Sequence, residues 1–176
     1  MRRDARINLL KHFLAALAYR TQKAVRGAPA HYADVRVAEN VRTPHELVWH
    51  MTGLMGYVIV LCRGGVWRPD RLATFEAELE RFHAKLKEVA HLLETEEFPE
   101  GVTPERVLQG PLADAMTHAG QLAMLRRCAG DPVAAENFLL ADIDPGRLGP
   151  DQRPPRAPKE GWRPDQPPPA PGRQLR

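Results

Sequence analysis

Between Leu72 and Leu93, apolar side chains recur at alternating spacings of three and four residues. The repeat consists of Leu72, Phe75, Leu79, Phe82, Leu86, Val89 and Leu93. Because an α-helix has 3.6 residues per turn, these positions share one face, so the spacing predicts an amphipathic helix that packs against other helices. We expect Asp70 to cap its N-terminus.

Two more helices are predicted before this one. A similar stripe near the N-terminus ends at Gly27 and consists of Ile7, Leu10, Leu14, Leu17, Thr21 and Ala24. The second helix begins at Thr43-Pro44-His45-Glu46, where Thr43 is the expected N-cap and Glu46 completes a capping box, and it ends at Gly64.

A fourth helix is predicted from Pro111 to Cys128. Thr103-Pro104 begins a helical segment before it, and we expect a kink at Gly110-Pro111, because proline lacks an amide donor. A short helical turn is expected between Asp131 and Phe138. Residues 1–144 are therefore predicted to form an all-α four-helix bundle.

The connections between the helices suggest a topology. The linker of residues 26–42 is long enough to span a helix, so we expect a crossover connection that makes helices 1 and 2 parallel. The shorter linker after Gly64 predicts that helices 2 and 3 are antiparallel. Residues 145–176 are rich in proline and arginine, which predicts an arm that is either disordered or extended along the bundle or a partner.

The charge distribution argues against nucleic acid as a partner. The net charge is +3, but residues 145–176 carry seven Lys and Arg against three Asp and Glu, which leaves −1 on residues 1–144. Binding to a phosphate backbone requires basic side chains clustered on one face. The two cysteines, Cys62 and Cys128, do not have the spacing of a disulfide framework or a zinc site, so we expect a cytoplasmic protein. Charged residues interrupt the apolar stripe near the N-terminus, so we expect no membrane span there.

Asp114, His118 and His50 form a candidate metal site. Asp114 and His118 are four residues apart, which places both on one face of the fourth helix, within reach of one ion. His50 lies among apolar residues of the second helix, which must pack in the same bundle. Glycines surround the candidates at positions 53, 56 and 120, which suggests close helix packing or space for a ligand.

Other polar residues are weaker candidates. Glu46 lies one turn before His50 and could be a ligand or a general base, although its place in the capping box favours a structural role. Tyr57 could line the pocket or fill the bundle. Both cysteines are too far along their helices to reach the same ion. The remaining histidines are predicted to lie on the surface: His12, His31, His83 and His91.

The segments 43–51 (TPHELVWHM) and 114–122 (DAMTHAGQL) resemble the helix 2 and helix 4 motifs of the DinB/YfiT-like superfamily. The resemblance covers residues 1–144 and implies a four-helix bundle with a crossover connection, a homodimer, and a metal held by one His of helix 2 and a His-x-x-x-His pair of helix 4. His50 and His118 match this pattern, whereas Asp114 stands where the family usually has His. Asp114 could ligate the ion directly or orient His118 as an acceptor.

Two His and one carboxylate suit a divalent ion such as Zn, Ni, Fe or Mn and leave positions open for a water or a thiol. The DinB/YfiT-like superfamily includes thiol-dependent transferases. The resemblance therefore implies a thiol S-transferase or a hydrolase that acts on a small-molecule substrate. The nucleophile would be an external low-molecular-weight thiol or water. The alternative is a non-catalytic helical interaction protein with a vestigial metal site.

Overall fold

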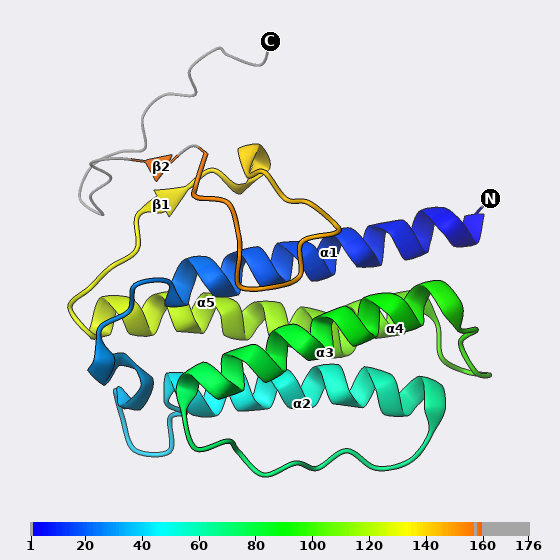
Figure 1. The fold of residues 1–176 in the computed structure, drawn as a ribbon, viewed down its shortest axis with the longest axis horizontal. Helices are drawn as coiled ribbons and strands as arrows, with labels where there is room; N and C mark the ends of the chain where they lie inside the picture. Colours follow the sequence, from blue (N-terminus) through cyan, green and yellow to red (C-terminus); the bar gives the residue numbers. More distant parts are fainter. Residues whose placement is uncertain (1, 157, 160–176) are drawn as a thin grey trace.

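The computed structural model describes residues 2–156 and 158–159, and these form an all-α fold with a two-stranded sheet of two residues per strand (Figure 1). The elements in chain order are α1 (Arg2–Val25), the 3-10 helix η1 (Ala30–Asp34), α2 (Pro44–Arg63), α3 (Phe75–Thr95), α4 (Pro104–Val107), the π-helical segment η2 (Leu108–Leu112), α5 (Ala113–Cys128), β1 (Ala135–Glu136), the 3-10 helix η3 (Phe138–Leu140) and β2 (Pro158–Lys159). No helix of the described residues is both long and apolar enough to cross a membrane.

The four long helices pack around one core. Helix α1 packs against α5 and α3, and α2 packs against the same two helices. Fully buried aliphatic and aromatic side chains from all four helices meet between them, among them Leu14, Met51, Phe82 and Leu122. Burying such side chains is the main favourable contribution to folding, so the predicted amphipathic stripes account for the assembly.

The crossover connection lies between α2 and α3, so the prediction that it joins helices 1 and 2 is wrong. Arg63 at the end of α2 pairs with Glu96, which follows α3, and His45 at the start of α2 contacts Phe75 at the start of α3. The two helices are therefore parallel, and residues 64–74 run back along their full length (Figure 1). Eleven extended residues reach about 36 Å, more than the roughly 30 Å of a 20-residue helix.

The linker of residues 26–43 stays at one end of the bundle instead of crossing over. It folds into η1, where Tyr32 is fully buried and its hydroxyl donates a hydrogen bond to the carbonyl oxygen of Leu122 at 2.7 Å. Helices α1 and α2 are consequently antiparallel (Figure 1). The length of the linker is taken up by η1, which packs at this end of the bundle.

The crossover segment is held by the first turns of α3. Thr74 caps this helix by accepting from the amide of Ala77 at 3.1 Å, so the predicted Asp70 cap is wrong. The buried carboxylate of Glu78 accepts from the amide of Leu72, also at 3.1 Å, and Arg81 donates to the carbonyl oxygen of Asp70. These bonds keep residues 70–72 outside the helix, although Leu72 fits the apolar repeat.

The predicted kink before the fourth helix is confirmed. Thr103 caps α4, and Gly110 then adopts φ −91° and ψ −105°, outside the helical region. Pro111 cannot donate the next helical hydrogen bond, so the chain changes direction before α5 begins. The kink places Asp114 in the first turn of α5, where the helix dipole favours a negative charge.

The segment after α5 returns over the bundle. The predicted helical turn between Asp131 and Phe138 is absent, because β1 is extended there and η3 begins only at Phe138. Residues 145–156 of the predicted arm lie against the helices: Leu148 is buried, and Arg26 donates to the carbonyl oxygen of Gln152. Residues 157 and 160–176 of that arm lie outside the described residues.

A candidate metal centre between α2 and α5

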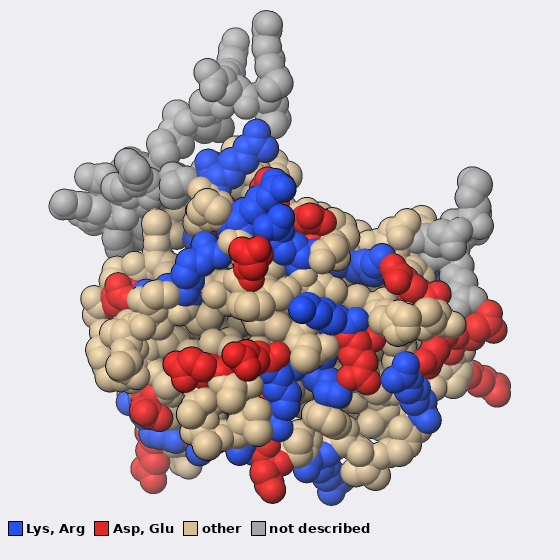
Figure 2. Space-filling model, in the orientation of Figure 1, with Lys and Arg blue, Asp and Glu red and all other residues tan. Residues whose placement is uncertain are grey.

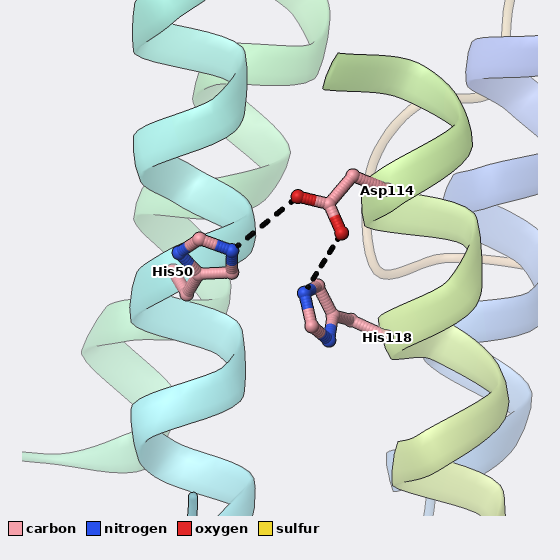
Figure 3. A group of neighbouring side chains, drawn as sticks. All are labelled: His50, Asp114 and His118. Carbon is pink, nitrogen blue, oxygen red and sulfur yellow. Dashed lines mark ion pairs between the residues drawn. The ribbon is translucent and has the colours of Figure 1, made fainter. Parts of the chain in front are cut away.

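The structure brings His50, Asp114 and His118 together, as the sequence predicts. His50 comes from α2, whose start is fixed by a complete capping box between Thr43 and Glu46, and the other two come from α5 just after the kink. Figure 3 shows the carboxylate of Asp114 facing both imidazole rings across the space between the two helices.

The three side chains are close enough to share one ligand. Nε2 of His118 lies 3.2 Å from Oδ1 of Asp114, and Nε2 of His50 lies 3.6 Å from Oδ2. The two rings are 4.8 Å apart between centroids and nearly perpendicular, at 82°. Each residue offers one ligand atom, and all three such atoms lie within 4.8 Å of one another.

Gln121 determines which nitrogen of His118 faces the group. Its Oε1 lies 2.7 Å from Nδ1 of His118, whereas the other ring nitrogen, Nε2, faces Asp114 (Figure 3). An amide oxygen only accepts, so Nδ1 carries the proton in this contact. A neutral imidazole has one N–H, which leaves a lone pair on Nε2, pointing at the carboxylate.

The surroundings of His50 lower its pKa and so favour its neutral form. Its side chain is 30% exposed, and burial is the largest cause that lowers its pKa, followed by the positive charge of Arg42 and by His118. Asp114 opposes this shift. A His with a lowered pKa keeps its lone pair at neutral pH, as a metal ligand must.

The contacts of Asp114 with the two histidines are compatible with a shared divalent ion. Metal bonds of about 2.0–2.2 Å to nitrogen and oxygen place neighbouring ligands of a tetrahedral or octahedral ion about 3.0–3.5 Å apart. The contacts at 3.2 and 3.6 Å fall close to this range, and the donor set of two His and one carboxylate is one that zinc and other divalent ions accept. Because Asp114 is 48% exposed, one side of the site is open to solvent.

The structure gives the other sequence candidates different surroundings. Glu46 closes the capping box of α2, with Oε2 accepting from the amide of Thr43 at 2.8 Å, and it also pairs with Arg36. Tyr57 is 51% exposed and so does not fill the bundle. The free thiols of Cys62 and Cys128 do not belong to the cluster of possible ligands.

His83 corrects the prediction of a surface histidine. It is only 2% exposed, and its Nδ1 lies 2.8 Å from the carbonyl oxygen of Leu148 in the returning C-terminal segment. Burial lowers its pKa. Its Nε2 is buried without a hydrogen-bond partner among the described residues. The segment that covers His83 is predicted from sequence to be either disordered or extended along the bundle or a partner, so the burial of His83 could not be predicted from the repeat in α3.

The glycines near the site have different explanations. A Cβ added at Gly56 would overlap the indole ring of Trp67 in the crossover segment, whereas one added at Gly53 or Gly120 meets no atom within 4 Å. Gly56 therefore accommodates the crossover segment, and not a ligand or a neighbouring helix of the bundle.

Gln121 and Arg42 are functional candidates that the sequence interpretation did not single out. The three-residue spacing between His118 and Gln121 places them on one helix face, which is a usable signal. Arg42 lies in the loop before α2, and nothing in its local sequence indicates that it lies near His50.

Positive charge elsewhere on the molecule is concentrated in the C-terminal part. On the face shown in Figure 2, Lys and Arg side chains gather near the upper edge, over the segment that leads to β2, whereas both signs occur over the helices. This agrees with the charge distribution of the sequence.

No model of a known protein family, no curated protein and no solved structure matches this chain. Membership of the DinB/YfiT-like superfamily, and the homodimer that it implies, therefore remain predictions from the two motifs.

Proposed function

We propose that the protein is a divalent-metal-dependent enzyme, a thiol S-transferase or a hydrolase, with His50, Asp114 and His118 as the metal ligands. The main observation that supports this proposal is the contact between His118 and Gln121. His118 has an acceptor at each nitrogen, Oε1 of Gln121 at 2.7 Å and Oδ1 of Asp114 at 3.2 Å. A neutral imidazole ring can donate a hydrogen bond to only one of these oxygens. A cation bound at Nε2 would stabilise the contact with the other oxygen, which lacks a hydrogen bond.

Each residue would have a distinct part. The two imidazoles and the carboxylate would hold the ion, and Gln121 would fix the tautomer and orientation of His118. An ion with open positions lowers the pKa of a bound water or thiol, which supplies a nucleophile at neutral pH. The exposed side of Asp114 gives small molecules access to this position.

The first test is the metal content of the full chain, purified without a histidine tag. We expect about one divalent ion per chain by elemental analysis after growth with added Zn, Ni, Fe and Mn. His118→Ala should lose the ion, whereas His12→Ala, at an exposed position of α1, should keep it. A metal-free wild-type protein would refute the proposal and favour a non-catalytic helical protein in which Asp114 simply pairs with the two histidines.

A second measurement distinguishes the two reaction classes. The metal-loaded protein is incubated with an aryl halide and a small thiol, or with an aryl ester alone. Release of halide that requires the thiol indicates a transferase, because the thiolate sulfur replaces the halide on the ring. Ester cleavage in water indicates a hydrolase. In either case, His118→Ala should abolish the rate.

A further inference from the structure

A hollow of about 440 Å³ opens beside the candidate metal centre. His118 and Gln121 form part of its wall, so a molecule in the hollow lies next to the proposed ion. Its volume is in the usual range for small-molecule sites, about 300–1,000 Å³. The loop before α2 forms the opposite wall and contributes Asn40 and Arg42.

Arg42 differs from the arginines around it. Arg36 and Arg71 both pair with Glu46, at 3.0 and 3.5 Å, and the same carboxylate caps α2. Arg42 is exposed and forms no hydrogen bond or ion pair with any residue that the structure describes. The carboxylate of Glu46, four residues after Arg42, is thus already occupied, and Arg42 lines the hollow without such a partner.

The rest of the hollow is partly apolar. Leu47 and Leu125 are almost fully buried in the wall, and Met124 is 49% exposed at its edge. With a divalent ion on Asp114, the site and Arg42 together would carry a net positive charge. This combination favours a ligand with a short apolar stem and a negative group, since a guanidinium binds a carboxylate through two parallel hydrogen bonds.

We propose that Arg42 is the anion-binding residue of this site and that the molecule reacting there is a small amphipathic carboxylate. This inference rests on the proposed function, because it places the reactive end of the molecule at the ion and the carboxylate at Arg42. Arg42 would thereby select the substrate or thiol cosubstrate by charge, without taking part in holding the metal.

The test compares two thiols of equal length, 3-mercaptopropionate and 3-mercaptopropanol, by calorimetric titration of the metal-loaded full chain. We expect the wild type to bind the carboxylate at least roughly tenfold more tightly, as expected for a hydrogen-bonded charge. Arg42→Gln should bind both thiols equally, and Arg42→Lys should retain part of the preference. Arg127→Gln is the matched control, since Arg127 is an exposed arginine outside the hollow.

The metal content of every variant is measured in parallel, which separates the two proposals. A wild type that binds metal but does not discriminate between the thiols overturns this inference alone. Loss of the ion in Arg42→Gln also overturns it, because Arg42 would then support the metal site itself. A wild type without metal overturns the proposed function and this inference with it.

Discussion

The amide oxygen of Gln121 lies 2.7 Å from Nδ1 of His118, one turn further along α5. The hydrogen bond fixes the ring so that Nε2 faces Asp114, 3.2 Å away. Groups that orient a metal-binding histidine in this way strongly affect metal affinity. Gln121 is therefore the most informative position for testing the site without removing a ligand.

Gln121→Leu should weaken metal binding by about 10- to 100-fold, because the ring loses the acceptor that fixes its tautomer. Gln121→Glu, which keeps an acceptor at the same place, should bind at least as tightly as the wild type. Competition with a chromophoric chelator measures both affinities. Equal affinities for Gln121→Leu and the wild type would contradict the assigned role.

Asp114→Asn distinguishes a ligand from a residue that only orients His118. If the carboxylate binds the ion, the amide should reduce metal affinity by more than about tenfold while changing the free energy of unfolding by only about 0.5 kcal/mol, because Asp114 is half exposed. Elemental analysis and urea denaturation give the two quantities. Nearly unchanged affinity would show that Asp114 is not a ligand.

Gly56→Ala and Gly53→Ala form a matched pair on α2. The first should destabilise the protein by about 1–3 kcal/mol, because its methyl group displaces the ring of Trp67. The second should stabilise it by about 0.5–1 kcal/mol, because alanine favours the helix and nothing lies within 4 Å. Urea denaturation followed by far-ultraviolet circular dichroism measures both; equal effects would mean that the crossover segment does not pack on Gly56.

His83 should make the protein less stable as the pH falls. Burial lowers its pKa in the folded state, and Lys87 adds to this, although the hydrogen bond to Leu148 opposes it. The unfolded chain, with a pKa near about 6.5, takes up a proton that the folded state resists. The free energy of unfolding is therefore highest above this pH and decreases below it, by up to about 1.4 kcal/mol per pH unit, until the lower folded pKa is passed.

His83→Gln should reduce this slope between pH 7 and 5, measured by urea denaturation at several pH values. The slope should not vanish, because burial also lowers the pKa of His45. His12→Gln, at an exposed position, is the control and should leave the slope unchanged. A slope unaffected by His83→Gln would show that its protonation is not linked to folding.

The sequence was informative about most features that local pattern decides, although the Asp70 cap and the helical turn between Asp131 and Phe138 were wrong. The apolar repeats predicted the long helices, the Thr43 to Glu46 capping box formed as expected, and Gly110-Pro111 produced the kink. The meeting of His50 with Asp114 and His118 could also be predicted, because spacing placed one pair on a helix face and the bundle had to bring α2 beside it.

The topology of the helix connections could not be predicted in the same way. Nor could the burial of a residue by a segment far from it in the sequence. Linker length sets only the maximum distance that a connection can span, and both the 26–43 and the 64–74 segments were long enough to cross. The fit of Trp67 on Gly56 accompanies the second arrangement, and such a fit depends on three-dimensional shape. His83 was misassigned for the related reason that residues far along the chain cover it.

The crossover between α2 and α3 has a consequence for synthesis of the chain. Helix α1 packs mainly on α5, and α2 packs mainly on α3, so neither helix of the amino-terminal half finds its principal partner until the second half has left the ribosome. Fragments cut within residues 64–74 should each remain unfolded alone and should associate into the native structure when mixed.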